Sequence, residues 1–297
     1  MPKTLIKRSI IMTQHNKSNL KLQPVQKEHD YTSLDIRYEK DLDLAWYFMH
    51  AQPRPCCTPA LVAEIQQWFD ELADSPHQEK VQYIALASKT TGIFNLGGDL
   101  EFTIDLIRQK DRDGLLGYAR LCVDTLWQQY MHLDRDITTI SLVQGDALGG
   151  GLEYALSSDV IIAEKRAKMG MPEILFNLFP GVGAYSLLSR KIGARLAEEI
   201  IQGGRLYSAV DMHEMGIVDV LADDGEGEMA VHDYIRKENR SRNGIRAFRA
   251  AKRCTNPLEY SELLGVAEIW ADAALRLRDR DLRMMERLVL RQSAKTK

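Results

Sequence analysis

The chain has 297 residues and a formal net charge of −3 at pH 7, with charged residues making up 27% of it. This balance excludes the basic footprint of a nucleic-acid-binding protein, so we expect no nucleic-acid partner. No uninterrupted apolar run approaches the roughly 18 residues of a membrane span, so we expect no membrane-embedded part. Four cysteines, two of them adjacent, are too few for a disulfide framework. A cytoplasmic protein of one or two domains, with reduced thiols used for packing, fits this composition.

The N-terminal part begins with a segment that lacks sustained hydrophobic periodicity. Residues 1–30 are rich in Lys, Gln and Asn, and their apolar patch, Ile10–Met12, is too short for a signal-peptide core. We therefore expect residues 1–30 to be a mobile extension. Alternating patterns then predict strands at Leu34–Tyr38 and Leu44–Met49, and an apolar stripe predicts a helix over Pro59–Leu72.

The middle of the chain contains two glycine-containing loops, and a predicted buried strand precedes each of them. The first strand is Val81–Ala87, and the loop Phe94–Leu100 follows it at some distance. The second strand is Ile137–Val143, and three consecutive glycines, Gly149–Gly151, separate it from a helix that begins near Leu152. Glycines between a strand and a helix allow backbone N–H groups to approach a ligand oxygen at the positive end of the helix. The second loop is therefore a candidate for one half of an oxyanion site.

Helical and strand-like patterns alternate through the rest of the chain, which predicts crossover connections and a largely parallel sheet. Beyond Glu228 the pattern is almost entirely helical. The remaining expected elements are a helix at Gly114–His132, a strand at Asp159–Ala163, helices at Val182–Ile192 and Ala194–Ile201, a helix capped by Ser208 that ends at Gly216, and a strand at Ile217–Leu221.

Two glutamates accompany the second glycine loop. Glu153 lies one turn into the helix that the glycines open, and Glu173 follows Pro172, a residue type favoured at helix starts. The short strand between them allows the chain to return to the same place. Two glutamates that meet in an apolar setting have their pKa values driven apart, which provides an acid and a base at neutral pH. Either glutamate alone is more readily explained as structural, so the catalytic interpretation rests on the whole set of residues.

Several other chemistries lack their sequence signatures. No Gly-x-Gly-x-x-Gly segment opens a first strand–helix unit and no P-loop is present, which excludes dinucleotide and nucleoside-triphosphate chemistry. The seven histidines are scattered, and none pairs at metal-ligand spacing near the glutamates, so no metal is expected. Without a Gly-x-Ser-x-Gly elbow, any hydrolysis at this site would use activated water rather than a serine nucleophile.

These loops and the Pro-Glu pair resemble the signature of the crotonase (enoyl-CoA hydratase) superfamily. That signature combines a loop like Phe94–Asp99, a loop like Gly145–Glu153 and a pair like Pro172–Glu173. The resemblance implies an α/β crotonase (ClpP-like) fold of stacked ββα units with a helical C-terminal region. It also implies a core at residues 31–225. The helical region, residues 226–297, would complete the acyl pocket and form oligomer contacts, as in the trimers common among crotonases.

The resemblance also implies the roles of individual residues, carried over by motif position. It assigns the oxyanion N–H groups to Gly98 and Gly150, and the two catalytic carboxyls to Glu153 and Glu173. Two such N–H groups would stabilise an enolate or a tetrahedral oxyanion on one carbonyl oxygen. For dehydration we expect Glu173 to remove the C2 proton and a protonated Glu153 to donate to the departing C3 hydroxyl. Within the superfamily, the presence of both glutamates favours a reaction that adds or eliminates water.

Further stretches narrow the resemblance to one branch. Pro53–Pro59, Asn256–Leu264 and Ile269–Trp270, together with the first glycine loop, are unlike a general hydratase. They resemble the diffusible-signal-factor synthases of Gram-negative bacteria, over roughly residues 30–292. In that branch a 3-hydroxyacyl thioester on acyl carrier protein is dehydrated to the cis-2-enoyl thioester and then hydrolysed to a free fatty acid, a quorum-sensing signal. The resemblance implies no cofactor beyond the carrier of the thioester, acyl carrier protein or CoA.

Two other functions remain open from the sequence. One is an ordinary enoyl-CoA hydratase of fatty-acid breakdown, which would turn over crotonyl-CoA well and release no free acid. The other is a mainly regulatory protein that acts through a sensor kinase domain, because binding to such a domain is known within this synthase family. Loss of free acid on replacing both glutamates, with partner binding kept, would separate the enzyme from the regulator.

A fatty chain needs a long apolar pocket, and apolar side chains flank the second glutamate. By resemblance, Trp270 and Leu288 of the C-terminal helices close the far end of this pocket. Ordinary core packing is the alternative for each residue, although flexible methionine suits a variable chain. The flanking residues are Met169, Met171, Leu175, Phe176 and Phe179.

Charged residues alternate along the last helical segment. One interpretation is a solvated face with intrahelical ion pairs. The other is a docking surface for an acidic carrier protein. The arginines concerned are Arg276, Arg278, Arg280, Arg283, Arg287 and Arg291.

Overall fold

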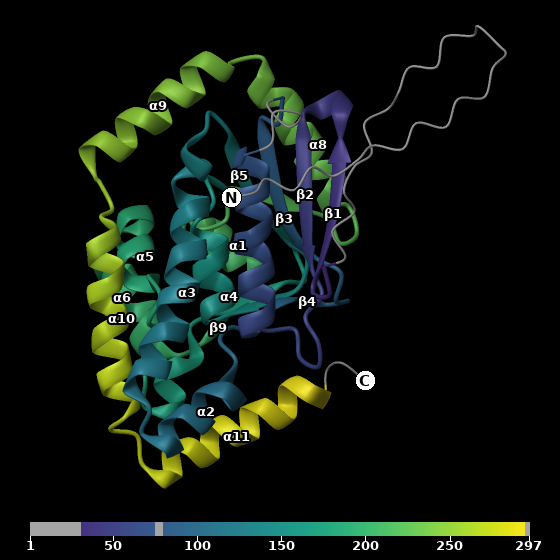
Figure 1. Ribbon diagram of the computed structural model, residues 1–297. Coiled ribbons are helices and arrows are strands. Elements are labelled where there is room, and N and C mark those ends of the chain that lie inside the picture. The colour runs from purple at the N-terminus through teal and green to yellow at the C-terminus, as the bar shows by residue number, and fades with distance from the viewer. Residues whose placement is uncertain (1–30, 75–79, 295–297) are drawn as a thin grey trace, which may run out of the picture. The chain divides into compact units, whose positions relative to one another are not determined.

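Two sheets organise the part of the chain that the structure describes (Figure 1). This computed structural model describes residues 31–74 and 80–294, and from Tyr31 onward the chain forms one compact unit. The expected mobile extension, residues 1–30, lies outside the described residues. No helix within the described ranges is long and apolar enough to cross a membrane.

The larger sheet contains the longest strands. In spatial order it consists of β1 (Leu34–Glu39), β2 (Leu44–Met49), β3 (Tyr83–Ser88), β5 (Thr138–Val143), β7 (Val160–Glu164) and β10 (Val220–Ala222). In this sheet β1 and β2 are antiparallel and the other neighbouring pairs are parallel. The smaller sheet consists of β4 (Ile93–Asn95), β6 (Asp146–Leu148), β8 (Lys168–Gly170) and β9 (Leu206–Ser208). Here β4, β6 and β8 are parallel, and β9 runs antiparallel to β8.

Helices connect the strands and form the C-terminal region. The α-helices are α1 (Pro59–Asp74), α2 (Leu100–Gln109), α3 (Arg112–Tyr130), α4 (Gly150–Leu156), α5 (Ala184–Ile192), α6 (Ala194–Gly203), α7 (Ala209–Glu214), α8 (Gly227–Asn239), α9 (Arg242–Thr255), α10 (Tyr260–Ala274) and α11 (Asp279–Ala294). The short 3-10 helices are η1 (Lys40–Leu42), η3 (His132–Asp134) and η4 (Pro172–Phe176).

The central strands repeat a ββα unit, as the sequence resemblance implied. Strand β3 is followed by β4 and α2, β5 by β6 and α4, and β7 by β8 and η4. Each unit places a long strand in the larger sheet and a short strand in the smaller one. Because β4 and β6 pair in parallel, the segments that leave them travel side by side. These two segments contain the two glycine loops.

Helices cover both faces of the larger sheet. Tyr47 of β2 belongs to the hydrophobic cluster that includes Trp68 and Phe69 of α1, whereas its neighbour Trp46 belongs to the cluster that includes Val231 of α8. Successive side chains of a strand point to opposite faces. All six residues of β2 are therefore buried, which explains their unbroken apolar sequence.

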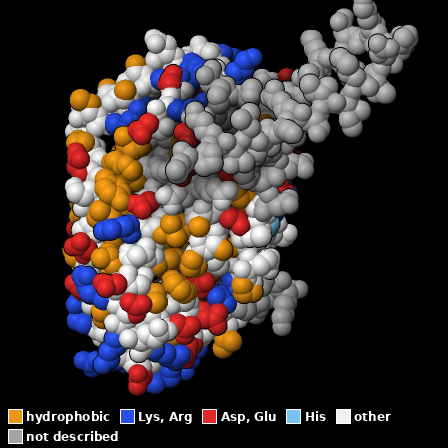
Figure 2. Space-filling model, in the orientation of Figure 1, with side chains coloured by type: hydrophobic (Ala, Val, Ile, Leu, Met, Phe, Trp, Pro, Cys, Tyr) orange, Lys and Arg blue, Asp and Glu red, His pale blue; other side chains and the backbone are white. Residues whose placement is uncertain are grey.

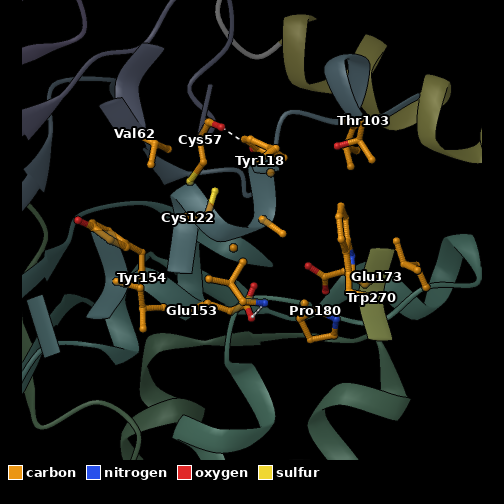
Figure 3. Close-up of a pocket in the computed structure, with 18 of the residues that line it drawn as sticks. Cys57, Val62, Thr103, Tyr118, Cys122, Glu153, Tyr154, Glu173, Pro180 and Trp270 are labelled. Carbon is orange, nitrogen blue, oxygen red and sulfur yellow. Dashed lines mark hydrogen bonds between the residues drawn. The ribbon is translucent and has the colours of Figure 1, made fainter. Parts of the chain in front are cut away.

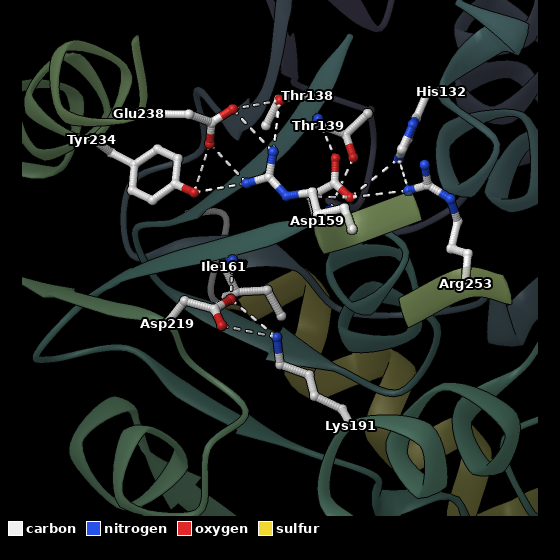
Figure 4. Close-up of polar contacts among 11 residues, drawn as sticks. His132, Thr138, Thr139, Asp159, Ile161, Lys191, Asp219, Tyr234, Glu238 and Arg253 are labelled. Atoms are coloured by element: carbon white, nitrogen blue, oxygen red, sulfur yellow. Dashed lines mark hydrogen bonds and ion pairs between the residues drawn. The ribbon is translucent and has the colours of Figure 1, made fainter. Parts of the chain in front are cut away.

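Arginine side chains, rather than apolar ones, attach α9 to the body. None of the residues of α9 is buried. Arg249 bonds the Glu238 carboxylate at 2.7 Å and the Thr138 hydroxyl at 2.8 Å, within the network of Figure 4. Arg253 lies 3.8 Å from Asp159 in the same network. These arginines pair with the buried carboxylate of Glu238 and with that of Asp159, which also lies 3.1 Å from His132.

The charged residues of the last two helices form pairs between helices as well as along them. Asp272 of α10 bonds Arg112 of α3 at 2.6 Å, and Glu286 of α11 bonds Arg108 of α2 at 2.5 Å. Pairs between helices form in addition to the intrahelical pairs considered from the sequence, because α10 and α11 pack against α3 and α2. Exposed pairs of this kind contribute little to stability, because water and salt screen the charges.

Candidate active site

The start of α4 supplies the first backbone amide of the site. The helix begins at Gly150, two residues before the predicted start. Its N-cap residue, Gly149, has φ +51° and ψ −125°, a conformation that favours glycine. A Cβ on Gly149 would lie 2.0 Å from Oε1 of Glu173. Gly149 therefore allows the chain to turn into α4. Because it has no side chain, it also leaves space for the Glu173 carboxyl next to the backbone.

The first glycine loop lies against the start of α4. Gly97 has φ +92°, and a Cβ there would lie 2.8 Å from the carbonyl oxygen of Leu148. A Cβ on Gly150 would lie 3.3 Å from the amide nitrogen of Gly98. Gly98 also forms an isolated parallel bridge with Cys57. The structure thus brings together the two residues that the sequence analysis assigned to the oxyanion site, Gly98 and Gly150.

Glu153 points from α4 to the N-terminus of α5. Its Oε1 accepts hydrogen bonds from the N–H groups of Val182, Gly183 and Ala184 at 2.9, 2.7 and 2.9 Å. The residue is 1% exposed. Burial raises the pKa of Glu153, and the three N–H groups oppose that rise because they stabilise the carboxylate. Glu153 therefore caps a helix as well as facing the candidate site.

Glu173 has a different environment, at the start of η4. Its Oε2 is buried and has no hydrogen-bond partner among the described residues. Burial, followed by the charge of nearby Glu153, raises the pKa of Glu173 to about 8. Glu173 therefore holds a proton at neutral pH. The sequence analysis placed the proton on Glu153 for the dehydration step, and the amides at the start of α5 favour the carboxylate form at that position.

One cavity is lined by both glutamates and both oxyanion glycines. Figure 3 shows the side chains of Glu153 and Glu173 at the centre of this cavity. Most of the remaining lining is apolar and comes from α1, α2, α3, η4, the segment 178–182 that follows η4, α10 and α11. Representative apolar residues are Leu61, Ile65, Leu126, Phe176, Trp270 and Met285.

The cavity includes only part of the predicted acyl pocket. Phe176, Phe179 and Trp270 line it. The sequence analysis missed the contribution of α1, which supplies Leu61 and Ile65. Both residues lie on the apolar face of the predicted helix, so the sequence indicated that they are buried. Nothing in the sequence indicated that this face lies near the glutamates.

The other residues predicted for the acyl pocket lie elsewhere. Met169 and Met171 are fully buried in the main hydrophobic core and do not line the cavity. Leu175 is 56% exposed. Leu288 packs against the cluster that contains Met285, beside the cavity rather than in its wall. Proximity in sequence to Glu173 was therefore a poor guide to the cavity wall.

Two thiols, those of Cys57 and Cys122, also line the cavity (Figure 3). Burial raises the pKa of both thiols, to about 12 for Cys122. A protonated thiol is a weak nucleophile. Their chemistry agrees with the packing role expected from the sequence.

Comparison with known proteins places this site in a family. Residues 52–257 match the family described as enoyl-CoA hydratase/isomerase, and the match covers more than half of the chain. The chain belongs to the enoyl-CoA hydratase/isomerase family, within the crotonase superfamily that its sequence resembles. The glycine loops and the two glutamates all lie within the matched region.

Individual relatives agree with that assignment. The chain is 28% identical over 202 residues to the probable mitochondrial enoyl-CoA hydratase 2 of Arabidopsis thaliana, covering 67% of this chain and 64% of that protein. It is 33% identical over 153 residues to the mitochondrial methylglutaconyl-CoA hydratase of Mus musculus, covering 51% and 46%. The chain thus spans less than two thirds of the length of either relative. The human mitochondrial delta3-delta2-enoyl-CoA isomerase shares the fold, with a TM-score of 0.74 at 16% identity over 89% of this chain and 100% of that one.

Proposed function

We propose that this chain adds water to, and removes water from, the C2–C3 bond of a fatty acyl thioester. The observation that carries the proposal is the meeting of Glu153 and Glu173 in one cavity with the adjacent loops of Gly98 and Gly150. An acid, a base and a pair of amides are the groups that this chemistry needs.

In the hydration direction, water lies between the two carboxyl groups. The ionised Glu153 removes a proton from the water, and the hydroxyl adds to C3 of the enoyl thioester. The electron pair of the C2–C3 double bond moves toward the thioester carbonyl, and the N–H groups of Gly98 and Gly150 hold the negative charge on its oxygen. Glu173 then gives its proton to C2. Its raised pKa, about 8, keeps that proton available at neutral pH.

Dehydration uses the same groups in reverse. The carboxylate of Glu173 removes the C2 proton, and a protonated Glu153 donates to the departing C3 hydroxyl. Both directions begin with one proton shared by the pair, placed on Glu173 for hydration and on Glu153 for dehydration. In dehydration Glu173 is the base and Glu153 is the acid, as the sequence analysis expected. In hydration the two residues exchange these roles. The amides around Glu153 make the hydration-ready placement of the proton the more stable one.

The finer proposal is that the chain synthesises a cis-2-unsaturated fatty acid signal. After dehydration of a 3-hydroxyacyl thioester, a water activated by a carboxylate would attack C1. The resulting oxyanion would be held by the same two amides until it expels the carrier thiolate, which takes up a proton. No serine is among the described residues that line the cavity, in agreement with hydrolysis by water. The sequence stretches at Pro53–Pro59 and Asn256–Leu264 support this branch.

Acyl carrier protein is the proposed carrier for this synthase function. Helix α11 borders the cavity through Met285. Figure 2 shows Lys and Arg side chains mixed with acidic ones along the lower edge of the molecule. Exposed arginines on and just before α11 would face the acidic surface of a carrier protein. They are Arg276, Arg278, Arg280, Arg283 and Arg287.

The test is mass spectrometry of the products formed from 3-hydroxyacyl thioesters of varied length, on acyl carrier protein and on CoA. The synthase proposal expects free cis-2-enoic acid from the carrier protein substrate, and loss of that acid in the Glu153→Ala, Glu173→Ala double variant. Unchanged product from the double variant would refute the roles given to the glutamates. Charge reversal at Arg283 and Arg287 is expected to lower kcat/KM for the carrier protein substrate and to spare the CoA substrate.

An enoyl-CoA hydratase without hydrolase activity is the second candidate. The named relatives include enoyl-CoA hydratases, and the proton on Glu173 matches the start of hydration. This candidate expects rapid interconversion of crotonyl-CoA and 3-hydroxybutyryl-CoA with no free acid. The same mass spectrometry therefore separates the two functions.

A further inference from the structure

The two oxyanion amides are supported in different ways. The N–H of Gly150 belongs to the first turn of α4, whereas Gly98 lies in the connection between β4 and α2. A loop N–H keeps one direction only if its neighbours are held. The contacts that hold the neighbours of Gly98 converge on Tyr118 of α3.

The Tyr118 hydroxyl bridges the backbone on either side of this loop. It accepts a hydrogen bond from the Asp99 N–H at 2.9 Å. It donates one to the Cys57 carbonyl at 2.5 Å, which Figure 3 shows as a dashed line. Cys57 in turn donates its N–H to the Gly97 carbonyl at 2.7 Å. A Cβ on Gly98 would lie 3.6 Å from the same hydroxyl. The Tyr118 oxygen therefore links Asp99, the residue after Gly98, to Cys57, the residue that pairs with Gly98.

The Tyr118 side chain has little freedom to move. Its ring lies edge to face with that of Phe102, with centroids 5.4 Å apart and planes at 79°. Burial raises the pKa of Tyr118 well above its ordinary value, so the hydroxyl remains a donor to Cys57 at physiological pH. Its proton is donated to the Cys57 carbonyl, so Tyr118 is not the acid that protonates the substrate.

A second contact holds the side chain of Asp99 rather than its backbone. Arg54 lies 2.9 Å from the Asp99 carboxylate, with 8% and 9% of the two side chains exposed. The same carboxylate accepts the Phe102 N–H at 3.3 Å and so caps α2. Breaking this ion pair would leave a buried charge without its partner. Removing the Tyr118 hydroxyl deletes one neutral oxygen and is the cleaner change.

We propose that Tyr118 is a positioning residue for the oxyanion site, whose hydroxyl fixes the direction of the Gly98 N–H. This inference rests on the proposed function, because it requires a thioester carbonyl oxygen held by Gly98 and Gly150. Loss of the hydroxyl frees the buried Asp99 N–H to seek another acceptor, which turns the neighbouring peptide. Polarisation of the bound thioester then falls while the apolar contacts that bind the acyl chain remain.

The experiment compares Tyr118→Phe with Tyr83→Phe in the full chain. Tyr83 is fully buried, and its hydroxyl bonds Asn239 at 2.8 Å outside the cavity. Each protein is mixed with cinnamoyl-CoA, a conjugated thioester whose absorption moves to longer wavelength when its carbonyl is polarised. The wild type and Tyr83→Phe are expected to show the full shift.

Tyr118→Phe is expected to show a smaller shift and a lower turnover. Its kcat for crotonyl-CoA hydration should fall at least about tenfold, within the ~10²–10³-fold loss that removing a whole oxyanion donor causes. Its KM should stay within about threefold of the wild type, because the lost interaction is made mainly in the transition state. A general packing defect would instead change both variants alike.

The outcomes separate this inference from the proposed function. An unchanged shift and kcat in Tyr118→Phe, or equal losses in both variants, would overturn the role of Tyr118 alone. A wild type that neither hydrates crotonyl-CoA nor shifts the absorption would refute the proposed function and the inference with it. If Tyr118→Phe does not fold, 3,5-difluorotyrosine at position 118 keeps the ring and weakens the hydroxyl as an acceptor. An unchanged absorption shift there would contradict the proposal.

Discussion

The surroundings of Glu153 and Glu173 differ although both carboxyl groups face one cavity. Glu153 sits against the first residues of α5 and accepts three backbone N–H groups on one oxygen. Glu173 sits on a short 3-10 helix, and its Oε2 has no hydrogen-bond partner in the described chain. Burial raises the pKa of both carboxyl groups, but only Glu153 has backbone N–H groups that oppose the rise, because the backbone around the two residues differs.

The N-terminus of α5 has free N–H groups, which explains why the Glu153 carboxylate lies against it. Gly183 is the N-cap of this helix and offers no side chain to cap it. The carboxylate of Glu153, from another helix, satisfies the orphan N–H groups instead and lies at the positive end of the helix dipole. We therefore expect Glu153 to contribute to both stability and chemistry, and Glu173 to contribute to chemistry at a cost in stability. Substitutions at the two positions should separate these contributions.

Glu173→Gln should cause a large loss of activity and no loss of fold. Removing an acid that donates to C2 should lower kcat by about 10²–10⁴-fold. The raised pKa of Glu173 means that its protonated form contributes stability fully present below the unfolded value of 4.5 and lost as the pH rises through about 8. The loss is at most about 1.4 kcal/mol per pH unit within that window.

Denaturant unfolding at pH 5 and pH 8 measures this second effect. The wild type should lose stability between the two pH values relative to Glu173→Gln, which cannot ionise. Equal pH dependence in both proteins would show that Glu173 ionises as freely in the fold as in the unfolded chain.

At Glu153, two substitutions should differ in stability and agree in activity. Both Glu153→Gln and Glu153→Ala remove the base, and each should lower kcat by about 10²–10⁴-fold. The glutamine carbonyl can still accept N–H groups at the start of α5, whereas alanine leaves them without an acceptor. Glu153→Ala should therefore be less stable than Glu153→Gln by about 1–3 kcal/mol. Equal unfolding free energies for the two variants would contradict the capping role.

The sequence predicted the long elements of the fold better than the short ones. Apolar runs such as Ile137–Val143 predicted the buried strands, because burial on both faces leaves an unbroken apolar pattern. The smaller sheet was missed because β4, β6 and β8 have three residues each, too few for a periodic signal. Helix α2 was also missed, since its cap, Asp99, had been grouped with the glycine loop.

For the site, the sequence motifs and the family resemblance named four residues that the structure brings to one cavity, but they did not predict the wall around them. Gly98, Gly150, Glu153 and Glu173 carry local signals in the sequence. The contributions of α1 and of Tyr118 depend on how distant helices pack, and no local pattern records that. Which of the two glutamates holds the proton also depends on packing, because the N–H groups that stabilise the Glu153 carboxylate come from another helix, α5.

Gly149→Ala should have a smaller effect that acts on Glu173 alone. A Cβ at this position would lie 2.0 Å from Oε1 of Glu173 and would displace the carboxyl. We expect kcat to fall about 10–10²-fold, as for a misplaced catalytic group. Gly216→Ala is the matched control, because Gly216 also has a positive φ, +80°, but no atom lies within 4 Å of its Cβ position. Both variants carry backbone strain, so equal activity in the two would exclude displacement of Glu173.

The smallest expected effect is the pH dependence of the wild type. Since the pKa of Glu173 is raised to about 8, kcat/KM should fall above that pH, approaching tenfold per unit as the shared proton is lost. Adding water to a double bond takes up no net proton, so the equilibrium constant does not change with pH. The ratio of kcat/KM in the two directions equals that constant, and the hydration and dehydration profiles must therefore have the same shape. Both directions need one proton on the pair, and they differ only in which glutamate holds it at the start. Rates measured from pH 6 to pH 10 in both directions test this, and a flat profile through pH 8 would show that Glu173 does not hold the proton.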